Sequence, residues 1–173
     1  LEKKGGATIL RVVQSGFSGD NWEAQFDGLT GGWAYFLFSL RLYLERHAGK
    51  ERHLMYVRWP IEIAPESAWP QLLGASGLNL QPIVPKPGDT CTFELSDARL
   101  SGDMVYYREA KNLVTTVGEV GDGVLFIEAE GRRAPWTCGV WLSMYGDRPD
   151  VDVWQARLEY LMSSLFPKSI EIS

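Results

Sequence analysis

The last third of the chain, Gly123–Phe166, constrains the fold more than any other stretch. Two apolar, strand-like segments lead there into an amphipathic segment, Val151–Phe166. Its large apolar residues recur at the spacing of one stripe on an α-helix, and they are Trp154, Leu158, Leu161 and Leu165. Because a helix with one apolar stripe cannot bury that stripe alone, we expect the preceding strands to form a sheet that covers it.

A stripe with the same spacing occurs near the start of the chain, at Trp33, Leu37, Leu40 and Leu44. Each helical segment also follows an apolar segment that ends in glycine. This order predicts an internal repeat, in which residues 1–50 are the final strand and helix of a preceding unit and residues 51–173 form the main unit. A first residue that is Leu and not Met agrees with the absence of the N-terminal part of that preceding unit. The alternative, that residues 1–50 are an extra strand and helix of one domain, stays open.

Composition and charge limit the class of protein. The chain has 173 residues, of which 45% are hydrophobic and 23% charged, as in globular proteins with a core. The net charge of -5 argues against binding to nucleic acid or to anionic membranes. No apolar run approaches the roughly 18 residues of a membrane span. Two cysteines, Cys91 and Cys138, are too few for a disulfide scaffold, so we expect a reduced, cytoplasmic protein.

The N-terminal helix is predicted firmly from Trp33 to His47, with Gly49 ending it. Three glycines lie just upstream of Trp33, and each costs about 1 kcal/mol inside a helix. We therefore expect the helix to start or kink near Gly31, with Thr30 as its N-cap. The alternative is one long helix that begins near Trp22.

The remaining segments indicate an α+β fold. Ala7–Val13 is typical of a strand, Gly16–Asp20 of a loop, and His53–Ile63 of a half-buried strand. A short helix follows over residues 64–74, and the proline-rich residues 75–89 form a surface connection. Five further strands are predicted at Thr90–Leu95, Asp103–Arg108, Leu113–Val120, Val124–Glu130 and Trp136–Tyr145. Since short turns join them, the strands are expected to form a curved antiparallel sheet wrapped around the C-terminal helix.

This order of elements, with the pair Ala68 and Trp69 in the short helix, resembles the START-like, or helix-grip, superfamily. The string QSGFSGDNWEAQFDGLTGGWAYFLFSLRLYLERH resembles more specifically the ending of the activator of heat-shock ATPase homologue family within it. The matching residues are Ser15, Gly16, Phe17, Gly32, Trp33, Leu37, Leu40, Leu44 and Glu45. The resemblance implies a tandem of two such domains, the first present only as its last strand and helix. It implies no particular activity, because the superfamily includes lipid carriers, cyclases and proteins without a known ligand.

Residues able to perform chemistry are few. His47 and His53 flank a charged turn and are expected at the surface, without a third ligand for a metal ion. Cys91 and Cys138 alternate with apolar residues and are expected to be small buried hydrophobes. Glu128 and Glu130 share one face of a strand, which we interpret as the wet face of the sheet. No catalytic residue, metal or cofactor is therefore expected, and a cyclase-like enzyme is the weakest alternative.

Aromatic residues supply the main candidate site. Amphipathic aromatic side chains suit a pocket for a flat hydrophobic ligand, although the same side chains fill ordinary cores. We expect a non-catalytic protein that binds a small hydrophobic ligand between sheet and helix, with a protein-interaction role of the co-chaperone kind as the alternative. Self-association, or pairing with a missing N-terminal segment, is also expected. The candidate ligand-binding residues are Trp69, Phe93, Tyr106, Trp141, Trp154 and Leu158.

Overall fold

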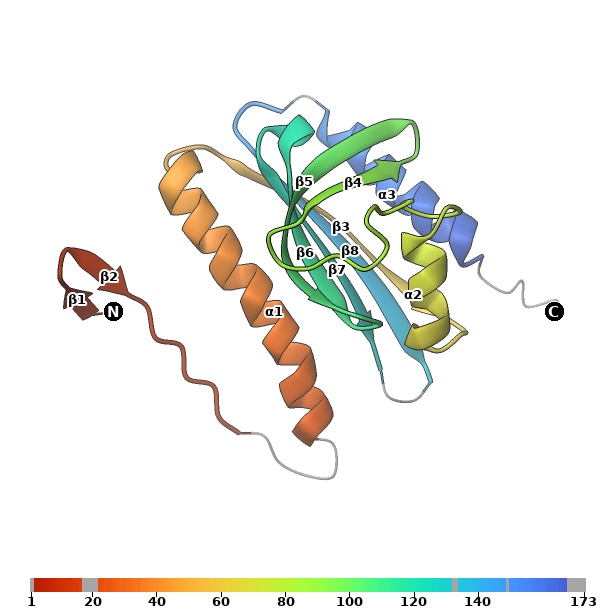
Figure 1. Cartoon of the computed structure of the whole chain (residues 1–173), viewed down its shortest axis with the longest axis horizontal. Helices are drawn as coiled ribbons and strands as arrows, with labels where there is room; N and C mark the ends of the chain where they lie inside the picture. The colour runs from red at the N-terminus through yellow and green to blue at the C-terminus, as the bar shows by residue number, and fades with distance from the viewer. Residues whose placement is uncertain (1, 17–21, 132–133, 149, 168–173) are drawn as a thin grey trace.

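The computed structural model describes residues 2–16, 22–131, 134–148 and 150–167, and its main body has three layers. A six-stranded sheet forms the middle layer, α2 (Pro65–Leu73) and α3 (Val151–Leu165) cover one face, and α1 (Trp22–Leu42) covers the other (Figure 1). We call the face toward α2 and α3 the inner face and the face toward α1 the outer face. Two separate apolar clusters occupy the two faces. The predicted α+β class is confirmed.

The sheet is entirely antiparallel, with strand order β3-β8-β7-β6-β5-β4. Its first and last strands in sequence, β3 and β8, pair along their whole length, from Arg52 opposite Tyr145 to Ile61 opposite Trp136. The strands are β3 (Arg52–Ile61), β4 (Thr90–Leu95), β5 (Ala98–Arg108), β6 (Asn112–Val117), β7 (Gly123–Glu130) and β8 (Trp136–Tyr145). All six predicted strands of the sheet are therefore present.

Strand β5 is longer than the sequence predicts, because it begins at Ala98 and not at Asp103. Ser101 and Gly102 lie inside it, although glycine and serine usually mark turns. At Gly102 a Cβ atom would lie 1.7 Å from the carbonyl oxygen of Thr116 on β6. The glycine therefore permits a close approach of two strands and does not end one.

Helix α3 packs its predicted stripe on the inner face. Trp154, Leu158 and Leu161 are buried, Leu165 is partly buried, and Phe166 closes the end of the same core. An antiparallel sheet wrapped on a long C-terminal helix is the helix-grip arrangement, so the predicted fold is confirmed.

The predicted start of the N-terminal helix near Gly31 is wrong. Helix α1 runs without interruption from Trp22 to Leu42 and continues as a π-helical turn, η1 (Tyr43–His47). Thr30 is not an N-cap, since its hydroxyl donates to the carbonyl oxygen of Phe26 one turn back, at 2.9 Å. Gly49, with φ of 83°, follows the helical segment as predicted.

Gly31 explains why a glycine stands inside this helix. It is buried against β6, and a Cβ atom there would lie 1.7 Å from Nδ2 of Asn112. Gly32, the next residue, has nothing within 4 Å of the equivalent position. The glycine at position 31 thus lets the helix approach the sheet closely, and this packing outweighs its poor helix propensity.

These neighbouring glycines give a matched prediction. Gly31→Ala is expected to destabilise the protein by about 1–3 kcal/mol because the new methyl group overpacks the contact with Asn112. Gly32→Ala is expected to stabilise it by roughly 0.5–1 kcal/mol, since the added Cβ meets no neighbour and improves helix propensity. Urea unfolding of both variants measures the difference. Equal effects of the two substitutions would contradict this packing of α1 on the sheet.

The N-terminal segment differs from its prediction. Only Ala7–Ile9 of the predicted strand Ala7–Val13 is paired as a strand, β2, in a hairpin with β1 (Glu2–Lys4). Most of the predicted Gly16–Asp20 loop lies outside the described residues. Among the described helices, none has the length and apolar character that crossing a bilayer requires.

Candidate functional site

The inner face brings together four of the six predicted ligand-binding residues. Trp69 on α2, Phe93 on β4, and Trp154 and Leu158 on α3 all belong to one buried cluster, and Leu158 is fully buried. The α3 side is fixed by polar contacts, since the indole nitrogen of Trp154 donates to Asp150 at 2.8 Å. The same carboxylate pairs with Arg148 at 2.7 Å. These residues line the interior between sheet and helices.

The other two predicted residues, Tyr106 and Trp141, lie on the outer face and pack against the cluster under α1. Tyr106 lies on the outer face because a β-bulge between Met104 and Tyr106 shifts the inward and outward alternation of β5 by one residue. Tyr107, which is not one of the six, faces the interior instead. Trp141 follows the regular alternation of β8. Placement alone does not test ligand binding, so that role stays a prediction for all six residues.

The α2 end of the interior is aromatic and only partly buried. Trp59, Tyr107 and Trp136 are partly buried there and pack against the inner cluster. The Tyr107 hydroxyl lies 3.4 Å from the indole nitrogen of Trp69, and the indole nitrogen of Trp59 donates to the carbonyl oxygen of Phe166 at 2.8 Å. Partly buried aromatic rings with polar tips are suited to contacts with an apolar ligand that carries a polar group.

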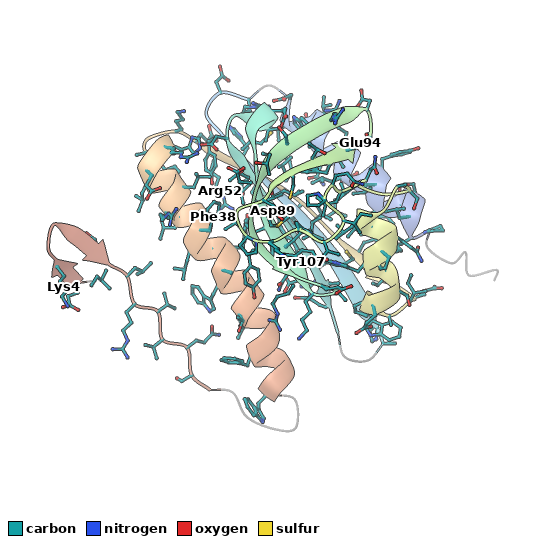
Figure 2. All side chains as sticks on the ribbon, viewed as in Figure 1. Lys4, Phe38, Arg52, Asp89, Glu94 and Tyr107 are labelled. Atoms are coloured by element: carbon teal, nitrogen blue, oxygen red, sulfur yellow. The ribbon has the colours of Figure 1, made fainter. Side chains whose placement is uncertain are left out.

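On the outer face, α1 is attached by an aromatic stack and a polar cluster. The Tyr35 ring stacks on Phe126 with centroids 4.7 Å apart, and Phe126 contacts Trp141 at 5.0 Å. The Tyr35 hydroxyl is hydrogen-bonded to Ser143 at 2.9 Å and accepts from Arg52 at 2.8 Å. Figure 2 shows Phe38 and Arg52 between α1 and the sheet. These specific contacts make α1 an integral part of the outer layer.

The predicted surface position of His47 is wrong. His47 is 3% exposed, and its ring stacks on Tyr145 with centroids 4.1 Å apart. Its Nε2 atom lies 3.1 Å from the carbonyl oxygen of Asp122, whose carboxylate pairs with Arg46 at 2.8 Å. The π-helical turn turns this ring toward the sheet, a geometry that the local charged sequence does not reveal. Among the described residues, no group of three His, Cys, Asp or Glu side chains could hold a metal ion.

Glu128 is also not on a wet face, because α1 covers that side of the sheet and leaves the residue 8% exposed. Burial and the neighbouring Glu130 carboxylate raise the pKa of Glu128 to about 8, while Arg58 acts in the opposite direction. Arg58 pairs with Glu130, which also accepts from the Thr137 hydroxyl at 3.3 Å. Glu128 is therefore largely protonated at neutral pH.

Both cysteines are free and buried, as predicted. Burial raises the pKa of the Cys138 thiol to about 12, and burial likewise raises the pKa of Cys91. A thiol held protonated is a poor nucleophile, so neither side chain is suited to covalent catalysis.

A shallow groove of about 400 Å³ runs between the edge strand β3 and α3. Tyr56, Arg58 and Trp59 line its β3 side, and Gln155 and Glu159 line its α3 side. The Gln155 amide donates to the carbonyl oxygen of Tyr56 at 3.3 Å, which partly covers the open strand edge. The groove contains none of the six predicted ligand-binding residues.

A further exposed apolar surface lies on α1 and the start of η1, on the side away from the sheet. We call this surface the outward stripe, and it comprises Trp22, Trp33, Phe36, Leu37, Leu40 and Leu44. Leu37, Leu40 and Leu44 are 40%, 43% and 63% exposed, and Trp22 and Phe36 are 49% and 56% exposed. The stripe includes all four residues of the N-terminal repeat. The helix is thus apolar on two opposite sides, of which the sheet covers one.

No protein-family model and no curated protein sequence matches this chain. Among solved structures, it is similar to DynU16, a putative protein in the dynemicin biosynthetic locus, with a TM-score of 0.54 and 13% identity over 65% of this chain. A conserved protein of unknown function, EF2215 from Enterococcus faecalis, has a TM-score of 0.51 and 16% identity over 75% of this chain and 85% of its own. This chain spans only 45% of the length of DynU16. At these identities the likenesses show the fold.

Proposed function

We propose that this chain is a non-catalytic binding module of helix-grip fold that acts through protein interaction, with the outward stripe of α1 as its contact surface. One observation carries the proposal. Leu37, Leu40 and Leu44 lie on one line along the helix and are each at least 40% exposed, opposite the face that packs on the sheet. Contiguous apolar surface of this kind marks protein interfaces. The buried, protonated thiols and the absence of a metal-binding cluster among the described residues give no support to a catalytic role.

The energy available at this surface is considerable. Full burial of one Leu or Phe side chain contributes about 1.5–3 kcal/mol, so several residues of the stripe together can support a stable complex. The partner must offer a complementary apolar surface. The face of a β-sheet is one such surface, because in this chain the apolar stripe of α3 packs against the inner face of the sheet. Free, buried cysteines are in keeping with a reducing, cytoplasmic location, which we include in the proposal.

Substitutions on the stripe test the proposed contact surface. The isolated chain is expected to self-associate at micromolar concentration, and Leu37→Glu or Leu44→Glu should weaken that association at least tenfold, because a charge replaces a buried apolar contact. Ile83→Glu is the matched control, since Ile83 is 73% exposed but lies in the 75–89 connection. Sedimentation velocity measures the dissociation constants. A monomer at all concentrations, or an equal effect of Ile83→Glu, would count against the stripe.

A second candidate function is binding of a small hydrophobic ligand between the sheet and α3, favoured by the partly buried aromatic residues Trp59, Tyr107 and Trp136. Native mass spectrometry of protein purified from its own host is expected to show a retained small molecule. Trp69→Ala should abolish retention, whereas Tyr106→Ala, on the outer face, should leave it intact. Retention that is lost equally in both variants, or no retained mass at all, would argue against ligand carriage.

A further inference from the structure

We infer that the outward stripe of α1 packs against the inner face of the sheet of a second helix-grip unit, which is formed by polypeptide N-terminal to this chain. The inference rests on the proposed function and names its partner. In this arrangement α1 is the last helix of the preceding unit and also covers the outer face of the unit described here. The two units then share one helix.

The geometry of α1 supports a helix with two contact faces. Gly31, Tyr35, Ser39 and Leu42 are buried toward the sheet, and they recur at spacings of three to four residues. Trp33, Leu37, Leu40 and Leu44 recur at the same spacings. Since each residue turns the helix by about 100°, the second set lies on the side directly opposite the first. A helix that is apolar on opposite sides is typical of one buried on both.

Helix α3 shows what such a stripe packs against. Its Trp, Leu, Leu and Leu have the same order and spacing as Trp33, Leu37, Leu40 and Leu44 of the outward stripe. Trp154, Leu158 and Leu161 are 6%, 0% and 5% exposed, and the inner face of an antiparallel sheet covers them. The same side-chain pattern on α1 is therefore matched in shape to the inner face of another sheet of this kind.

The segment before α1 lies on the same side as the stripe. Figure 1 places α1 between the sheet and the β1–β2 hairpin with its extended continuation. The side-chain oxygen of Gln14 accepts a hydrogen bond from the indole nitrogen of Trp33 at 2.8 Å. Ile9, Leu10, Val12 and Val13 are 41% to 73% exposed. An apolar extended segment followed by a helix repeats the order of β8 and α3, so it can supply the last strand of the second sheet.

A second copy of this chain is a poorer occupant. In every copy α3 already fills the inner face, and Leu158, Leu142 and Val140 there are fully buried. A copy could therefore offer its own outward stripe but no vacant inner face. The solved structure of DynU16 shows that a unit of this fold occurs within a longer chain, because the match covers 45% of that protein.

The test is made on the natural gene product isolated from its host. Intact mass spectrometry is expected to give a mass well above 19.4 kDa, by on the order of 100 residues, the size of a small domain. Hydrogen exchange should show α1 protected as strongly as α3, and sedimentation should show a monomer. Leu37→Glu in this longer product should increase exchange in α1 at least tenfold, whereas Ile83→Glu should leave it unchanged.

Each other outcome is decisive. A longer product whose outward stripe stays accessible to carbene footprinting would overturn the shared helix. A product of 19.4 kDa that forms a dimer through the stripe would overturn the second unit but leave the proposed protein interaction intact. A product of 19.4 kDa that stays monomeric, with the stripe accessible, would overturn both.

Discussion

Leu158→Ala is expected to lower the free energy of unfolding by about 2–5 kcal/mol. Leu158 is 0% exposed at the centre of the α3 stripe, where the inner face of the sheet surrounds it. Removing its side chain loses the transfer free energy and leaves a cavity that the rigid sheet cannot fill. Urea unfolding, followed by tryptophan fluorescence, measures the change.

The control for Leu158→Ala is Tyr160→Ala on the same helix, where the side chain is 66% exposed. This variant is expected to change stability by less than about 0.5 kcal/mol. A loss at Leu158 well under about 1 kcal/mol would contradict close packing of α3. It would instead indicate loose space in the interior, and so would favour ligand carriage over the filled core.

Stability is expected to fall as pH rises from about 4.5 to about 8, because of Glu128. Its folded-state pKa, about 8, lies above the ordinary value of 4.5. A group with a raised folded-state pKa contributes stability that is fully present below its unfolded pKa and is lost as pH rises through its folded pKa. The loss amounts to roughly 5 kcal/mol, since the pKa of Glu128 rises from 4.5 to about 8 and one pKa unit corresponds to about 1.4 kcal/mol.

Glu128→Gln isolates this contribution, because a neutral amide retains a donor for Glu130 and does not titrate. The variant is expected to match the parent protein near pH 4 and to exceed its stability by roughly 5 kcal/mol near pH 9. Glu94→Gln, at an exposed position on β4, controls for loss of a carboxyl group. Unfolding curves at several pH values give the difference between parent and variant. A difference that stays constant between pH 4 and pH 9 would exclude a buried, protonated Glu128.

The sheet and its inner helix could be predicted from sequence because their signals are local and periodic. The stripe at Trp154 and Leu158 follows the helical period, and the alternation from His53 to Ile63 follows the strand period. Each pattern agrees with the turns around it, so the order of elements leads to the helix-grip fold. Four of the six predicted interior residues face the interior for the same reason.

The errors occur where tertiary contacts override a local signal. The glycines before Trp33 suggest a helix start, but Gly31 is required by Asn112, a residue far away in sequence. Regular alternation from Met104 would turn Tyr106 inward, and a single bulged residue sends Tyr107 inward instead. Such contacts become visible only once the strands are paired.

His47 and Glu128 share one cause of error. Both were expected on surfaces exposed to water, and both are covered because the N-terminal helical segment packs on the outer face. The sequence of the main unit alone predicts a sheet with one wet face. The domain assignment of residues 1–50 stays a prediction, and the shared helix is the form in which we propose it.

Strand β7 connects the two faces of the sheet mechanically. Phe126 points outward under Tyr35, whereas its neighbours Leu125 and Ile127 point inward into the core under α2 and α3. With close packing on both sides, the strand cannot bow toward water to enlarge the interior, because any such movement would displace the Tyr35 stack. The flexibility of the sheet that lines the interior therefore depends on the contacts that α1 makes on its outer face. If the proposed partner presses α1 onto the sheet, we expect this part of the sheet to become more rigid, and if it draws α1 away, we expect it to become more flexible.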